Sequence, residues 1–273
     1  MKRLSLSIFA LIALLSACKS EMEEAQSRWS TLQVWENQRI EETTYEVREG
    51  EAPIGRAVMR IYKGEEDLSR FGKEVAKSSK REEVFRVSLM QSVANPAGMG
   101  EPVHRLDSWW FDTDELRLRY GTQSAYLWNG AVFKEIRVGK DAAYITVHSH
   151  LSGVEELETD FPSEAVVQAG AGFFIRAVLS SMQRLTKIPV VSMGSVWLSA
   201  RPTVLKSDFR VIGEEVLNVA GEQLPTRIVE LSNEMGSKRY WIGAGAPSLL
   251  VQWEDENGYL FVMTGHRYLD WPK

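Results

Sequence analysis

The sequence has a single cysteine, Cys18, and only four histidines among its 273 residues. One cysteine excludes an intrachain disulfide framework and a metal site built from several thiolates. The chain also lacks a Gly-x-Ser-x-Gly nucleophile elbow, a His-Glu-x-x-His zinc motif, a phosphate-binding glycine loop and a dinucleotide-binding fingerprint. We therefore predict no catalytic residues, no metal and no cofactor, and we expect that the protein is not an enzyme.

Long apolar runs are also missing. After Leu14, no segment approaches the roughly 18 consecutive apolar residues that a membrane-spanning helix needs. Positive charge is in deficit too, because the formal net charge is −5. An acidic chain argues against nucleic acid as a partner. What remains is an ordinary globular composition with a generous nine tryptophans.

Residues 1–18 have the pattern of an export signal. Lys2 and Arg3 form a positive start, and an apolar run from Leu4 to Leu14 follows. This run has the length of a signal-peptide hydrophobic region and is too short to cross a bilayer as a permanent helix. It ends in Leu15-Ser16-Ala17-Cys18, which resembles the lipobox of bacterial lipoproteins. The alternatives are an ordinary secretory signal with an incidental cysteine, or a buried N-terminal helix.

The lipobox resemblance implies where in the cell the protein is located. In bacterial lipoproteins the cysteine sulfur receives a diacylglycerol, the signal is cut before it, and the new amino terminus is acylated with a fatty acid such as palmitate. Lipidation of Cys18 would hold the protein on a membrane without spanning it. Lys19 stands where aspartate marks inner-membrane retention in enterobacterial lipoproteins. The same resemblance therefore implies the outer membrane, with the protein facing the periplasm.

This reading divides the chain into three parts. Removal of the signal peptide, residues 1–17, takes away Lys2 and Arg3 and leaves 256 residues, so the formal charge changes from −5 to −7. Residues 18–28 are predicted to be the acylated cysteine and a polar, acidic tether. Residues 29–273 are predicted to form a single β-rich domain. It would begin with a short amphipathic helix that turns Trp29, Leu32 and Trp35 toward the core.

Alternating apolar and polar residues dominate the chain after Thr43 and predict a mainly β fold. The loop Asp255–Gly258, with Asn-Gly inside it, predicts a hairpin. Successive strands at short spacing favour a large curved antiparallel sheet or half-barrel. The predicted strands cover residues 44–48, 56–62, 84–90, 104–111, 116–121, 125–128, 133–138, 143–150, 190–199, 209–219, 223–231, 238–242, 248–254 and 259–267.

One main helix, at about 163–184, is predicted to cover the sheet. Val167, Phe174 and Val178 share one of its sides, and Gly170 and Gly172 predict close packing or a kink.

Further resemblances are distant. The segments 213–216, 220–230, 240–242 and 247–250 resemble a family of uncharacterised bacterial exported β-rich proteins. The strand–helix–strand order is similar to the open half-barrel of periplasmic lipoprotein carriers and receptors. In those proteins a curved sheet and covering helices enclose an apolar cavity for acyl chains. The resemblance implies a fold only, and it transfers no functional residue.

Two sets of side chains are candidate sites. His148 and His150 would point to the same face of a strand and could begin a metal site, with Glu155 or Glu156 as a further ligand. No third ligand is set by spacing, so a polar surface is the preferred interpretation. The second set is a group of tryptophans that could line an apolar cavity or a binding face: Trp109, Trp110, Trp128, Trp197 and Trp241. Because Trp109 and Trp110 are adjacent, they should face opposite sides of the sheet and indicate a second packed surface.

Three functions are compatible with these patterns. The first is a membrane-anchored, non-enzymatic binding module that holds a hydrophobic ligand or an envelope protein partner. The second is a structural or assembly lipoprotein without a small ligand. The third is an envelope glycan or lipid hydrolase, which would need two carboxylates facing each other across a cleft.

Overall fold

We describe a computed structural model for residues 21–77, 81–95, 101–127, 130–150, 152–162, 164–179, 182–193, 202–255 and 257–270. The predicted signal peptide and Cys18 lie outside these residues, as do Trp128 and Trp197. Within the part of the chain described, no helix is both long and apolar enough to cross a membrane.

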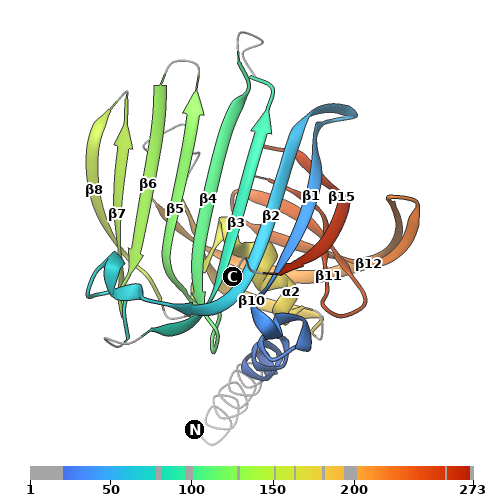
Figure 1. Ribbon diagram of the computed structural model, residues 1–273, viewed down its shortest axis with the longest axis horizontal. Helices are drawn as coiled ribbons and strands as arrows, with labels where there is room; N and C mark the ends of the chain where they lie inside the picture. Colours follow the sequence, from blue (N-terminus) through green and yellow to red (C-terminus); the bar gives the residue numbers. More distant parts are fainter. Residues whose placement is uncertain are drawn as a thin grey trace, which may run out of the picture.

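One large curved sheet of fifteen strands forms the body of the protein (Figure 1). Its strands, in chain order, are β1 (Arg39–Glu49), β2 (Ala52–Glu66), β3 (Glu82–Val93), β4 (Val103–Asp112), β5 (Leu118–Leu127), β6 (Gly130–Val138), β7 (Ala142–Ser149), β8 (Gly153–Asp160), β9 (Val166–Val167), β10 (Arg184–Ser192), β11 (Thr203–Val219), β12 (Glu222–Asn233), β13 (Gly236–Gly243), β14 (Leu250–Glu254) and β15 (Leu260–Asp270). The mainly β, open curved-sheet prediction is confirmed.

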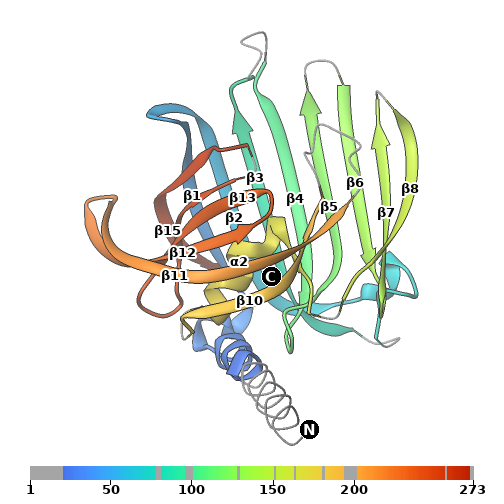
Figure 2. The same ribbon diagram turned by 180° about the vertical axis from the view of Figure 1, so that it is seen from behind.

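The strand order shows how the two halves of the chain combine. From the middle of the sheet, β1 to β8 follow one another to one edge, and β15 to β9 lead to the other edge. The first and last strands, β1 and β15, pair with each other in antiparallel register. Among the described strands, only β9 and β10 pair in parallel. The sheet curves so that the β10–β13 strands face the inner side of the β2–β6 wall (Figure 2).

Helix α2 (Ala171–Val178) lies against the concave face, where all eight of its residues are buried (Figure 1). It falls inside the helix predicted at about 163–184 but is much shorter. Val166 and Val167 form strand β9 instead, in keeping with the preference of β-branched residues for extended backbone. A short 3₁₀ helix, η3 (Gln168–Gly170), follows, and β10 begins at Arg184.

Two glycines allow α2 to approach its neighbours closely. A Cβ atom on Gly170 would lie 2.6 Å from the ring of Phe111, and one on Gly172 would lie 2.7 Å from Leu250. The predicted close packing at these glycines is therefore confirmed. As a result, α2 and the aromatic side chains around it fill much of the space that the curved sheet encloses.

The N-terminal segment differs from the predicted tether and helix. Residues 21–30 are helical, and Ala25 and Gln26, inside the predicted tether at 18–28, are buried. A 3₁₀ helix, η1 (Gln33–Gln38), follows. Residues 19–27 are polar and acidic, which favoured a solvated linker, but one side of the helix carries Met22, Ala25 and Trp29 against the core. Trp29 and Trp35 are core residues as predicted.

Candidate functional site

The most site-like feature is a small pocket on the concave face, between the two halves of the sheet. Alternate residues of β2–β4 point into it from one side, residues of β13–β15 from the other, and the start of α2 from below. Its volume is about 60 Å³. The apolar walls are Met59, Val87, Leu89 and Trp109, then Tyr240, Leu250, Trp253 and Phe261, with Phe173 of α2.

One wall of the pocket carries buried charge. Arg105 and Asp107, two residues apart on β4, face the same side and form a bidentate ion pair at 2.9 Å (Nε to Oδ1) and 2.7 Å (Nη2 to Oδ2). Gln91, opposite Arg105 on β3, also lines the pocket. Bidentate geometry is the strong form of such a pair. The pocket is therefore amphipathic, with apolar walls and one polar side.

The polar side continues deeper as a row across the sheet. Gln123 on β5 lies opposite Asp107 and donates from Nε2 to Oδ2 at 3.4 Å. Its Oε1 is buried and has no hydrogen-bond partner among the residues described. Lys134 on β6, opposite Gln123, is also buried and donates to the Met193 carbonyl at 3.0 Å, just after β10. This contact joins the two halves of the sheet across the interior.

A larger, more open pocket of about 380 Å³ adjoins the first and shares Gln168, Lys238, Glu254 and Asp255 with it. Ser192, Asn233 and Ser237 make its lining more polar. Carboxylates are present here, but Asp255 accepts hydrogen bonds from the backbone N–H groups of Asn257 and Tyr259 within its own hairpin loop. Asp107 of the inner pocket is held by Arg105. Asp255 and Asp107 are therefore not positioned as free acids or bases, and Glu254 is the third carboxylate of the lining.

Below the pocket, Arg176 of α2 forms a fully buried ion pair with Glu41 of β1, at 2.7 and 2.9 Å. Arg176 also donates to the Ser248 carbonyl at 2.8 Å. Burial acts to lower the pKa of the guanidinium, but the adjacent Glu41 carboxylate outweighs burial and raises it. The pair fixes the position of α2 and, through it, the floor of the pocket.

Beside this ion pair, β15 carries two half-buried aromatic side chains, His266 and Tyr268, whose rings meet edge to face at 4.9 Å. Burial lowers the pKa of His266 and raises that of Tyr268 to about 12. His266 Nε2 and the Tyr268 hydroxyl are buried without hydrogen-bond partners among the described residues. His266 is therefore neutral at pH 7.

This arrangement predicts a pH dependence of stability. A histidine whose folded pKa lies below its unfolded value of 6.5 contributes fully above pH 6.5, and the contribution is lost as the pH falls through the folded pKa. We expect the free energy of unfolding to fall as the pH is lowered below 6.5, and His266→Gln to flatten that fall. Urea titrations at each pH measure it. The exposed His104→Gln is the control; an equal flattening there would contradict the assignment.

The predicted tryptophans do not come together. Trp109 faces the pocket, whereas Trp110 lies on the convex face in a second cluster with Leu68 and Tyr120, as the adjacent pair predicted. A 3₁₀ helix, η2 (Leu68–Phe71), supplies Phe71, whose ring stacks on Tyr120 at 3.8 Å. Trp241 donates from Nε1 to Glu215 at 2.9 Å, and its strand neighbour Tyr240 takes the pocket side. Only Trp109 of the described candidates therefore lines the pocket.

Two aromatic residues that line the pocket, Tyr240 and Trp253, are not among the candidate residues named from the sequence. The signal that could have found the polar wall is Arg105-x-Asp107-x-Trp109, because alternate residues of a strand face the same side.

The two histidines of the possible metal site, His148 and His150, are exposed, and His150 Nδ1 lies 3.1 Å from the Ala131 carbonyl. In the described ranges, no group of three histidine, aspartate or glutamate side chains is placed to hold a metal ion.

A row of side chains that includes several exposed apolar ones runs across the convex face. Strand register places Met90, Leu106, Ser124, Phe133, His148 and Val154 side by side on β3 to β8. Leu106 is 43% exposed, Phe133 39% and Val154 62%, and Tyr126 in the next row is 63% exposed. Large exposed apolar patches are typical of interaction surfaces.

Comparisons with known proteins give a similarity of fold. No family model and no curated protein matches the chain. Among solved structures, the chain is similar to a β-barrel-like protein of the domain of unknown function DUF1849 from Brucella abortus. The two share 6% sequence identity with a TM-score of 0.48, over 86% of this chain and 99% of that one.

Proposed function

We propose that this chain is a lipid-anchored protein of the cell envelope that binds the apolar part of a ligand, or of an envelope protein partner, in the concave pocket. Cys18 would carry the lipid, and the protein would reside on the outer membrane and face the periplasm. The observation that carries the binding role is the amphipathic pocket itself, with aromatic walls from both halves of the sheet and a buried Arg105–Asp107 pair on one side. Ligand pockets combine apolar walls with a few placed polar groups in this way.

The size of the pocket limits the ligand. Pockets that bind drug-sized ligands measure roughly 300–1,000 Å³, whereas the inner pocket measures about 60 Å³ and the adjoining outer pocket about 380 Å³. The inner pocket suits a short apolar group, such as the end of an acyl chain or a single apolar side chain. The remainder of the ligand would lie in the outer, more polar pocket along Lys238 and Glu254.

The direct test is ligand recovery. The chain from Lys19 onward, exported with a signal peptide that lacks a lipobox, is purified from the periplasm and examined by native mass spectrometry and solvent extraction. We expect a reproducible apolar species to remain bound. Ala169→Phe should reduce recovery of this species several-fold. Ala169 is exposed on η3 in the pocket wall, so the larger ring would occupy space that the ligand needs. Incorporation of labelled palmitate into the intact protein, and its loss in Cys18→Ala, tests the anchor separately.

A matched control keeps this test specific. Ala52→Phe places the same bulky group at an exposed position of the β1–β2 hairpin, which does not line either pocket. Recovery of the ligand should be unchanged in this variant. An apo mass for the unaltered protein, with nothing to extract, would refute a bound hydrophobic ligand.

An assembly role without a small ligand is the second candidate. Two observations favour it: the concave side holds the buried helix α2, and the exposed side chains of Leu106, Phe133 and Tyr126 lie on the opposite face. An apo mass combined with a crosslink from a photoreactive residue at Tyr126 to one envelope protein would support this role.

A further inference from the structure

The helix at residues 21–30 is part of the domain rather than a flexible tether. Gln26 donates from Nε2 to the Glu115 carbonyl at 2.8 Å, in the turn between β4 and β5. Trp29, 3% exposed, packs against Trp35 and Phe173 at ring distances of 4.8 and 5.1 Å. The helix is therefore bound to the body of the protein by both a polar and an aromatic contact.

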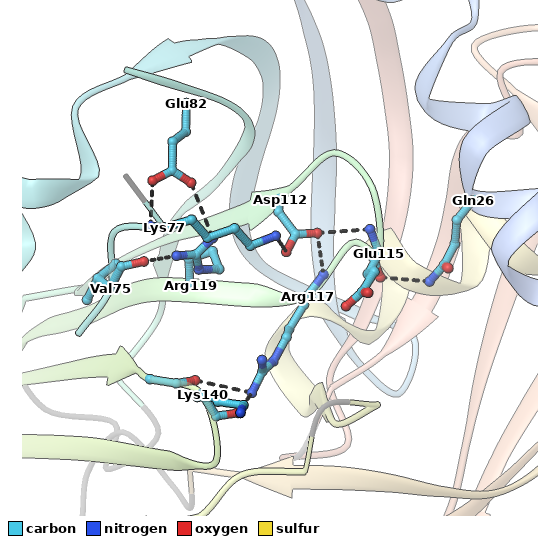
Figure 3. Close-up of polar contacts among 10 residues, drawn as sticks. Gln26, Val75, Lys77, Glu82, Asp112, Glu115, Arg117, Arg119 and Lys140 are labelled. Atoms are coloured by element: carbon cyan, nitrogen blue, oxygen red, sulfur yellow. Dashed lines mark hydrogen bonds and ion pairs between the residues drawn. The ribbon is translucent and has the colours of Figure 1, made fainter. Parts of the chain in front are cut away.

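The part of the domain next to this helix is cross-linked by hydrogen bonds (Figure 3). Asp112 accepts from the backbone N–H of Glu115 at 2.9 Å and pairs with Lys77 at 3.2 Å. Arg117 donates to the Lys140 carbonyl at 2.6 Å, which joins the β4–β5 and β6–β7 turns. We call this end of the sheet, made of the turns at 112–117 and 139–141 together with residues 21–30, the base.

The pocket opens at the other end of the strands. Strand β1 starts beside the base at Arg39 and runs to Glu49, and the register Arg48↔Leu260 places the β14–β15 hairpin loop at that far end. Register through β14 and β13 brings Glu254, Lys238 and Asn233 to the same end. These residues line the outer pocket.

Chain length restricts how the domain can sit on a membrane. Only Lys19 and Ser20 separate Cys18 from Glu21, where the described helix begins. Three residue steps span at most about 11 Å. On β4, the pocket residues Trp109 and Arg105 lie three and seven residues before Asp112 of the base, which corresponds to about 10 and 23 Å along the strand. The connection to the lipid is therefore shorter than the distance from the base to the far side of the pocket.

We infer that the lipid anchor holds the base toward the bilayer and turns the pocket mouth away from it. The inference rests on the proposed lipidation of Cys18. As a consequence, the ligand enters and leaves the pocket from the aqueous compartment. It would be delivered or collected by a soluble partner or by a partner on the opposing membrane. Extraction of the ligand from the bilayer that carries the anchor is disfavoured by this geometry.

Depth measurement with the full, lipidated protein in vesicles tests the inference. Cys18 is the only cysteine and its sulfur is blocked by the lipid, so one introduced cysteine takes a fluorophore specifically. Asp114→Cys labels the base, and Met235→Cys labels the β12–β13 hairpin, where Met235 is 79% exposed. With nitroxide on the lipid headgroups, we expect several-fold stronger quenching at position 114 than at position 235.

A spacer provides the matched control. Twenty Gly-Ser residues inserted between Ser20 and Glu21 have a root-mean-square reach of about 25 Å, and should reduce the difference between the two labels. Equal quenching at both positions without the spacer, or stronger quenching at 235, would overturn the inference. A protein that carries no acyl group and does not bind vesicles would overturn it together with the proposed anchor. Ligand recovery from the anchor-free chain is independent of all these outcomes.

Discussion

Glu41→Ala is expected to lower the free energy of unfolding by about 3–5 kcal/mol, because it leaves the Arg176 guanidinium charged and without its partner in the interior. Both side chains are at most 2% exposed, and the two hydrogen bonds between them measure 2.7 and 2.9 Å. The measurement is the free energy of unfolding from urea denaturation followed by tryptophan fluorescence.

Two further variants isolate the cause. Glu46 pairs with Arg48 at 2.6 Å, but both side chains are about one-third exposed, so Glu46→Ala should cost about 1 kcal/mol or less. Glu41→Leu combined with Arg176→Leu removes both charges and should recover part of the loss. Recovery stays incomplete because the Ser248 carbonyl also loses its donor. A Glu41→Ala cost no larger than that of Glu46→Ala would refute the role assigned to the pair.

Trp29→Ala is expected to cost about 3–5 kcal/mol, the range for removing a large aromatic side chain from a core. The Trp29 indole packs against three aromatic rings: Trp35 of η1, Phe85 of β3 at 5.2 Å, and Phe173 of α2. Its Nε1 also donates to the Pro247 carbonyl at 3.3 Å. Loss of the ring would remove the packing that joins the N-terminal helix to α2.

Thermal and urea denaturation measure the effect, with Trp29→Phe as the comparison. Phenylalanine keeps an aromatic ring at the centre of the cluster but lacks the donor to Pro247, so a loss of about 1–2 kcal/mol is expected. A cost within about 1 kcal/mol for Trp29→Ala would mean that the helix at 21–30 is only loosely attached. The orientation inferred for the anchored domain would then lose its structural basis.

Much of the sheet could be predicted because its strands follow a simple alternation. The β14–β15 hairpin is the clearest case, since Asn257-Gly258 marks the turn and Gly258 adopts a φ of 80°. The prediction failed where the interior is polar. Residues 116–121 and 125–128 were predicted as two strands, but β5 is continuous, because Gln123 is buried beside Asp107 instead of lying in a turn.

The site was less predictable than the fold for the same reason. Sequence patterns place charged residues on the surface, whereas Arg105, Asp107 and Lys134 lie inside and satisfy one another or main-chain carbonyls. Which tryptophans contact one another depends on the order of the strands across the two halves of the sheet. Residue patterns in a single sequence do not reveal that order. Adjacent residues of one strand point to opposite faces of the sheet because of the backbone geometry alone, so the opposite orientations of Trp109 and Trp110 were predicted.

The pairing of β1 with β15 has a consequence for biogenesis. The register from Arg39↔Asp270 to Arg48↔Leu260 joins the beginning of the domain to its end. If the chain is exported from its N-terminus, as proposed above, β1 to β8 could assemble early, but one long edge of β1 would stay open until β15 arrives. Unpaired edges recruit other chains. The chain is therefore most exposed to aggregation just before its last strand is in place, and under the proposed export an envelope chaperone would have the most to protect at that stage.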